Sequence, residues 1–167
     1  MSIKRACLIA MMLAMAIVLN IIEGFIPMFI PGVKLGLANC IILIMLYQMK
    51  WYEALLVMIL RILLVGLFRG NIFTLTWLMS LSGGVCSFIV MLIFSKINFF
   101  SPIGTSVLGS ISHCFGQIVV AMLMLSASSF IYYLPFIALL SVLTGVINGM
   151  ICRLLNKRKI LETILNR

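Results

Sequence analysis

The chain has 167 residues, of which 65% are hydrophobic and only 9% are charged. A soluble domain carries about a quarter charged residues, so this composition excludes a water-soluble globule and indicates an integral membrane protein. The formal charge of +9 would suggest a nucleic-acid partner in a soluble protein. In a membrane protein, basic residues flank the spans and contact anionic lipid, so we expect a lipid bilayer around the chain and no nucleic acid.

A membrane-spanning helix needs about 20 mostly apolar residues, which leaves room for five or six spans and no separate soluble domain. Pro, Gly and polar residues divide the chain into apolar segments. We predict an all-α fold, a single transmembrane domain over 1–167 with a basic cytoplasmic tail at 153–167. Its six helices are expected at approximately 6–26, 35–49, 54–68, 72–95, 103–126 and 130–152.

Basic residues set the orientation. With the N-terminus in the cytoplasm and six spans, nine Lys and Arg face the cytoplasm and two face outside, which follows the positive-inside rule. Both termini are therefore expected to be cytoplasmic in a multi-pass protein of the cell membrane. The nine are Lys4, Arg5, Lys50, Lys96, Arg153, Lys157, Arg158, Lys159 and Arg167, and the two are Lys34 and Arg69.

Signatures of nucleotide or metal chemistry are absent from the sequence. It contains no Walker A pattern, no GxGxxG and no HExxH. The five cysteines are dispersed through apolar stretches without a CxxC pair, which is typical of small buried side chains rather than a metal site or a disulfide framework. We therefore expect no metal, no cofactor and no catalytic residue.

Ionisable and amide side chains inside a bilayer are costly, which makes each one a candidate for function. Arg61 lies midway along the third span, and His113 and Gln117 lie four residues apart on one face of the fifth. Together these side chains predict a polar funnel that opens to the outside and binds a small molecule. The candidate ligand-binding residues are Glu23, Lys34, Asn39, Arg61, His113 and Gln117. The alternative is a Glu–Arg ion pair with interhelical hydrogen bonds that only hold the bundle together.

Small residues recur every four positions in the first span. Ala6, Ala10 and Ala14 lie on one face of its cytoplasmic half, and small residues at this spacing let another helix approach closely. The partner helix could belong to a docking subunit or to this same chain.

Several strings resemble the Gx transporter family, which is also catalogued as heptaprenyl diphosphate synthase component I. The resemblance covers the chain from Ala6 to about Cys152. The strings are Glu23 to Pro27, Pro31-Gly-Val-Lys-Leu-Gly-Leu-Ala-Asn39, Arg61, Ser80-Leu-Ser-Gly-Gly84, Gly104-x-Ser106-x-x-Gly109-x-x-x-His113-x-x-x-Gln117-x-x-x-Ala121 and Tyr133-x-Pro135.

The resemblance implies kinship with the substrate-binding S components of energy-coupling factor transporters. Those are small six-helix proteins that capture a vitamin or precursor from outside and dock through an AxxxA face onto a transmembrane coupling subunit with two ATPases. It therefore implies uptake of a small molecule, such as a quinone, isoprenoid or flavin-type precursor, with Ala6, Ala10 and Ala14 at the docking face.

The second family label implies a different role, in heptaprenyl diphosphate and menaquinone side-chain synthesis. Prenyl chain elongation uses Mg²⁺ held by several carboxylates, yet this chain has no aspartate and only three glutamates. The alternative is therefore a non-catalytic membrane subunit, for which we expect a lipid-facing groove. A third hypothesis is a stand-alone proton-coupled transporter with Glu23 and His113 as a relay, although inverted repeats are not visible.

Overall fold

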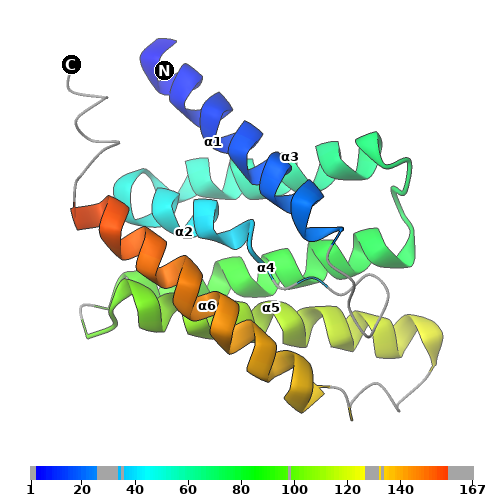
Figure 1. Cartoon of the computed structure of the whole chain (residues 1–167). Coiled ribbons are helices and arrows are strands. Elements are labelled where there is room, and N and C mark those ends of the chain that lie inside the picture. The colour runs from blue at the N-terminus through cyan, green and yellow to red at the C-terminus, as the bar shows by residue number, and fades with distance from the viewer. Residues whose placement is uncertain are drawn as a thin grey trace.

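The computed structural model describes residues 3–25, 34, 36–97, 99–126, 132 and 134–157. These residues form a bundle of helices without any strand in the described part of the chain (Figure 1). The helices are α1 (Ile3–Glu23), α2 (Asn39–Gln48), α3 (Trp51–Phe68), α4 (Leu75–Ser95), α5 (Pro102–Leu125) and α6 (Leu134–Lys157). The all-α fold predicted from composition is confirmed.

Five of these helices are long and apolar enough to cross a membrane, and α2 is the exception. At 1.5 Å per residue, the 10 residues of α2 reach only about 15 Å, half of the hydrocarbon core. The prediction of a helix over 35–49 is therefore wrong in its first part, because residues 34 and 36–38 are not helical.

The other helices depart from the predicted spans at their ends. The first begins and ends about three residues earlier than predicted, and α6 runs to Lys157, so part of the predicted basic tail is helical. The breaks predicted at Pro27 and Pro31-Gly32, the family string that begins at Tyr133, and the tail beyond Lys157 lie outside the described residues.

The short helix α2 lies at the centre of the bundle. Eight of its ten residues are buried, and it contacts every other helix, as expected for a helix that is hydrophobic all round. Helix α5 packs between α4 and α6, whereas α1 packs mainly on α3 and its N-terminal half projects from the bundle (Figure 1).

Close approach of backbones holds α5 between its neighbours. A Cβ atom on Gly149 of α6 would lie 2.5 Å from the Cα atom of Ile103, and one on Gly116 of α5 would lie 2.9 Å from the carbonyl oxygen of Ser82. Small residues at such contacts favour helix association in membranes, where apolar lipid removes the hydrophobic driving force.

Candidate functional site

The candidate site is organised around the segment ahead of α2, in which Lys34 and residues 36–38 are described and are not helical. Gly36 in this segment has φ of +84°, a backbone conformation that residues with a Cβ atom rarely adopt. Non-helical backbone at membrane depth requires hydrogen-bond partners from the protein itself. Three helices supply these partners through polar side chains, so non-helical backbone directly precedes the short helix α2.

Gln117 of α5 binds both backbone groups of Lys34. Its Oε1 atom accepts a hydrogen bond from the Lys34 amide at 2.8 Å, and its Nε2 atom donates to the Lys34 carbonyl at 3.2 Å. Two bonds to the backbone of one residue fix the orientation of the Gln117 amide, since its oxygen must face the Lys34 N–H group.

Glu23 and Asn148 bind the next part of the segment. The Glu23 carboxylate at the end of α1 accepts hydrogen bonds from the amides of Gly36 and Leu37, and Asn148 of α6 donates to the Gly36 carbonyl at 3.2 Å. Among the described residues Glu23 forms no ion pair, so the Glu–Arg pair considered from the sequence is not formed. Glu23 acts here as an acceptor for backbone amides.

Arg61 is buried midway along α3, with 2% of its surface exposed. Its Nη2 atom donates to Asn39 Oδ1 at 3.2 Å, and Asn39 in turn donates to Ser87 Oγ at 3.1 Å. The Nε and Nη1 atoms of Arg61 have no hydrogen-bond partner among the described residues. The guanidinium therefore presents two nitrogen atoms, which carry three N–H bonds, without a partner among the described residues.

His113 is the second residue with an unpartnered polar atom. Its Nε2 atom contacts Gln117 Nε2, and its Nδ1 atom lacks a partner among the described residues. Because the Gln117 nitrogen is a donor, His113 Nε2 must accept, and the proton of the neutral ring is then on Nδ1. His113 thus presents one unpartnered N–H donor.

The glycine pair of α4 separates His113 from Arg61. A Cβ atom on Gly83 would lie 2.9 Å from His113 Cε1, and one on Gly84 would lie 3.9 Å from Arg61 Nη2. The absence of side chains at these positions leaves room for both polar groups, and brings helices α3, α4 and α5 together at one depth.

The end of the cluster beside the C-terminal end of α1 carries two further cations, Lys34 and Arg69. Lys34 Nζ donates to Asn20 Oδ1 at 2.9 Å, and Arg69 Nη2 donates to the Ile21 carbonyl at 3.1 Å. The partial negative charge at the C-terminal end of α1 favours a cation at this position. Between these side chains is a cavity of about 10 Å³ lined also by Trp77 and Ser80, roughly the room that one water molecule requires.

All six candidate residues predicted from the sequence belong to this cluster of polar contacts, although only Lys34 lines the small cavity. Lys34 and Asn39 flank the extended segment, Glu23 and Gln117 bind its backbone, and Arg61 and His113 lie deeper. Glu23 and His113 have different hydrogen-bond partners, so the described contacts do not form the direct relay of the proton-coupled hypothesis.

Sequence reasoning did not single out three of the contributing residues. They are Gly36, whose backbone conformation bends the segment, and Ser87 and Asn148, which bond to Asn39 and Gly36. A lone asparagine within the apolar run of α6 was the one available signal, because an amide inside a membrane helix requires a partner.

The alanine face of α1 points away from the bundle. Ala10 and Ala14 are exposed and Ala6 is half-buried, whereas Ile9 and Ala16 on the opposite side are buried in the core. The described helices therefore leave Ala10 and Ala14 uncovered.

A second surface feature lies on another side of α1. An apolar groove of about 910 Å³ is bounded by α1, α2 and α6 and opens sideways. Its lining includes Leu8, Met11 and Met15 of α1 and Ile151 of α6. Ala6, Ala10 and Ala14 do not line it, so the alanine face and this lateral groove are separate surfaces.

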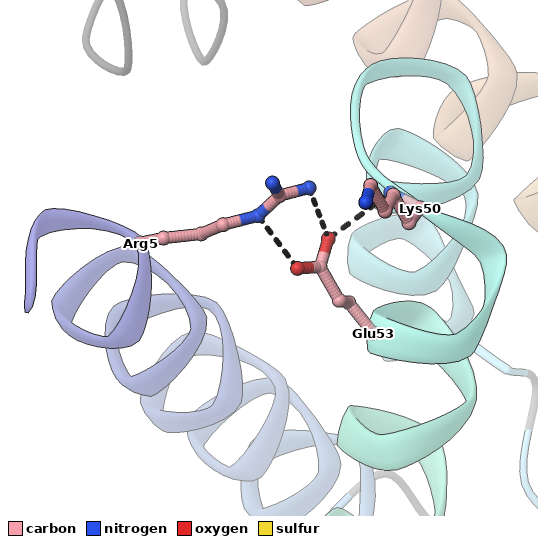
Figure 2. Close-up of polar contacts among 3 residues, drawn as sticks. All are labelled: Arg5, Lys50 and Glu53. Atoms are coloured by element: carbon pink, nitrogen blue, oxygen red, sulfur yellow. Dashed lines mark hydrogen bonds and ion pairs between the residues drawn. The ribbon is translucent and has the colours of Figure 1, made fainter. Parts of the chain in front are cut away.

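An ion pair joins α1 to α3 at the opposite end from Glu23. Arg5 Nε lies 2.7 Å from Glu53 Oε1, and Glu53 Oε2 accepts hydrogen bonds from Arg5 Nη2 at 3.1 Å and from the Lys50 amide at 3.0 Å (Figure 2). Glu53 thus caps the first turn of α3 while it binds α1. Within the described residues no group of three or more His, Cys, Asp or Glu side chains could hold a metal ion.

Comparison with known proteins gives one family. No curated protein and no solved structure matches the chain. The family model described as heptaprenyl diphosphate synthase component I matches residues 12–155, which includes all six helices in whole or in part and every residue of the polar cluster from Asn20 to Asn148. The chain belongs to the heptaprenyl diphosphate synthase component I family.

Proposed function

We propose that this protein is a substrate-binding membrane component that captures a small extracellular molecule for ATP-driven uptake. The observation that carries the proposal is the pair of buried side chains Arg61 and His113, in which Nε and Nη1 of Arg61 and Nδ1 of His113 meet no described acceptor at hydrogen-bond geometry. Buried polar groups are normally hydrogen-bonded, and the cost of leaving them unpaired is what a bound ligand would remove.

The chemistry of these donors defines the ligand class. All three are donors, so the complementary ligand group is an acceptor, such as a carboxylate, a quinone carbonyl or a phosphate oxygen. The Nε–H group and the Nη1 amino group of Arg61 point to different sides of the planar guanidinium, so each can donate to a separate acceptor oxygen. Quinone, isoprenoid and flavin-type precursors all carry such groups.

Entry from outside requires the extended segment to move. Lys34, Gly36 and Leu37 are bound by Gln117 and Glu23, so these bonds must be exchanged for bonds to the ligand or water. Only side chains whose interaction free energy differs between the ligand-loaded and the empty state can drive this exchange. We assign that role to Arg61, His113 and Gln117.

Transport then needs a partner that supplies energy. The exposed Ala10 and Ala14 form a surface on which a helix of a coupling subunit with two ATPases can pack closely. This proposal assigns Ala6, Ala10 and Ala14 to docking, and it places the ligand on the other side of α1 from the coupling subunit.

The ligand site is tested by mass spectrometry of small molecules retained by the purified protein, followed by binding measurements. Arg61→Lys keeps the positive charge but loses the planar guanidinium donors. His113→Ala removes the ring N–H donor. Each should weaken binding by about 1–3 kcal/mol. The matched control is Ser112→Ala, which removes a half-buried hydroxyl bonded within α5. Retention of the same molecule at full affinity by both site variants would refute the site.

Docking is tested by co-purification with the ATPase module. Ala10→Leu should weaken association because the larger side chain separates the two helices, while ligand affinity stays the same. Ile22→Leu, at another exposed position of α1, should have no effect. Unchanged association of the folded Ala10→Leu protein would show that this face does not dock.

A second function is favoured by the family description and the lateral groove. The chain would then be a non-catalytic membrane subunit of a heptaprenyl diphosphate synthase, since it lacks aspartate and carries three glutamates in all, while prenyl elongation needs several carboxylates around Mg²⁺. Its test is co-purification with a soluble prenyl synthase and stimulation of that enzyme in vesicles. Association with the synthase rather than the ATPase module would select this function.

A further inference from the structure

The small cavity beside Lys34 and Arg69 lies where the C-terminal end of α3 meets the N-terminal end of α4. Its volume is about 10 Å³, roughly the room that one water molecule requires, so it can hold a single small particle. Its lining comes from α1, α3, α4 and the segment ahead of α2. Among the described residues that form this lining, two are cations and none carries a carboxylate. The wall of the cavity is therefore positively charged.

The two cations have no counter-ion among the described residues. Neither Lys34 nor Arg69 forms an ion pair there. The Glu23 carboxylate at the end of α1 accepts hydrogen bonds from backbone amides instead, and it does not line the cavity. Two like charges beside one small cavity repel each other, and a low dielectric strengthens that repulsion. An anion between them would replace the repulsion by attraction.

Both cations keep N–H groups for such an anion. Lys34 Nζ carries three N–H groups, and among the described residues it donates to Asn20 Oδ1 alone. Arg69 bonds through Nη2 only, to two backbone carbonyls at the end of α1. Because Arg69 is exposed and follows the last turn of α3, an ion can reach the cavity past its side chain.

Trp77 supplies a third donor. The residue is buried, with 9% of its surface exposed, and it lines the cavity. Its indole Nε1 atom has no hydrogen-bond partner among the described residues, although a buried indole N–H usually finds one. A Cβ atom on Gly66, which also lines the cavity, would lie 2.7 Å from this nitrogen. The missing side chain at Gly66 leaves the N–H edge of the ring uncovered on that side.

A monatomic anion satisfies these three groups better than water does. Water carries no charge to offset two cations, whereas such an anion accepts several hydrogen bonds at once and donates none. We propose that the cavity binds one small monovalent anion of halide size, held by Lys34 Nζ, the Arg69 guanidinium and the Trp77 indole N–H. The proposal does not rest on small-molecule capture at Arg61 and His113, because neither of them lines this cavity.

The cavity contains its own probe, since bromide quenches indole fluorescence on contact. The chain has two tryptophans, so the full-length Trp51→Phe protein, purified in neutral detergent with gluconate as the anion, reports on Trp77 alone. Bromide added at constant ionic strength should quench this fluorescence with saturation, and chloride should reverse the quenching by competition. The Trp77→Phe protein, which keeps the exposed Trp51, should show collisional quenching without saturation. Quenching of Trp77 that rises linearly with bromide, or that chloride does not reverse, would overturn the proposal.

Charge variants in the Trp51→Phe protein locate the ion. Lys34→Gln and Arg69→Gln should each weaken bromide binding about tenfold or more, because each removes a hydrogen bond from a charged donor. The matched control is Lys96→Gln, which removes an exposed cation at the other end of α4 and should leave bromide binding unchanged. Equal losses in all three variants would show a general effect of protein charge and would refute the site.

Ion size separates a halide site from a contact with the carboxylate of a larger molecule. Acetate should compete with bromide much more weakly than chloride does, because the cavity has room for one particle of about the size of water. Equal competition by acetate would contradict the proposal. Failure of this inference and failure of small-molecule capture are distinguishable. Loss of saturable quenching with normal retention of the captured molecule would refute the halide site alone, and the reverse would refute capture alone.

Discussion

The Gln117 side chain binds Lys34 through both backbone groups of that residue, at 2.8 and 3.2 Å, across 83 positions of sequence. The geometry replaces the hydrogen bonds that a helix would have supplied within the segment. It joins α5 to the extended chain before α2, and the same amide nitrogen contacts His113. One side chain thus connects the backbone ahead of α2 to the polar cluster.

Removal of this amide should destabilise the empty protein. Gln117→Ala leaves the partly buried Lys34 N–H and C=O groups without their partner, and an unsatisfied buried group costs about 1–3 kcal/mol. We expect a lower melting temperature in detergent without added ligand. Ser112→Ala on the same helix should change it little, because Ser112 bonds only to the Gly109 carbonyl of its own helix. Equal melting temperatures for the two variants would show that water replaces Gln117 fully.

Gly36 and Gly70 form a matched pair for the second prediction. Both have positive φ angles, +84° and +62°. A Cβ atom on Gly36 would lie 3.0 Å from Asn39 Nδ2 and 3.3 Å from His113 Cδ2, whereas one on Gly70 would meet nothing within 4 Å. Alanine at either position carries the backbone strain of about 1–2 kcal/mol.

Gly36→Ala should therefore lower the free energy of unfolding more than Gly70→Ala does. Only Gly36→Ala should weaken ligand binding, because its new methyl group displaces Asn39 and His113. The measurement is thermal unfolding of both variants with and without the retained molecule. Equal losses of stability, with ligand binding intact, would contradict the placement of Gly36 against the site.

The five long helices were predictable because their apolar runs are long enough to cross a bilayer, and Arg61 and His113 were predictable because charge or polarity is rare in such runs. The non-helical segment before α2 was not predictable from the sequence. Leu37 and Ala38 continue the apolar run of α2, so hydropathy alone extends the helix through them. The backbone instead bonds to Glu23, Gln117 and Asn148, and no local pattern reveals partners that are up to 112 positions away.

The ion pair of Arg5 with Glu53 leads to the third prediction. Glu53 is buried, with 4% of its side chain exposed, and it also accepts the Lys50 amide. Glu53→Ala should therefore lower the melting temperature more than Arg5→Ala, because it removes both the link to α1 and the cap of α3. The double variant should resemble Glu53→Ala alone. Additive losses in this double-mutant cycle would show that Arg5 stabilises the protein through other contacts.

The last prediction concerns the number of crossings. The short helix α2 covers only about 15 Å, so residues 34–48 complete a crossing only if the extended segment continues through the outer half of the bilayer. In that arrangement Phe25 and Trp51 lie on opposite sides of the membrane, and so do Phe99 and Tyr132, because α5 is about 36 Å long at 24 residues. All four side chains are exposed. With the five native cysteines replaced, an impermeant thiol reagent added to intact cells should label Phe25→Cys and Tyr132→Cys but spare Trp51→Cys and Phe99→Cys. The excess of basic residues on one side predicts which positions face the cytoplasm and are therefore spared. Labelling of Phe25→Cys and Trp51→Cys from the same side would show that residues 34–48 enter and leave the bundle without crossing it.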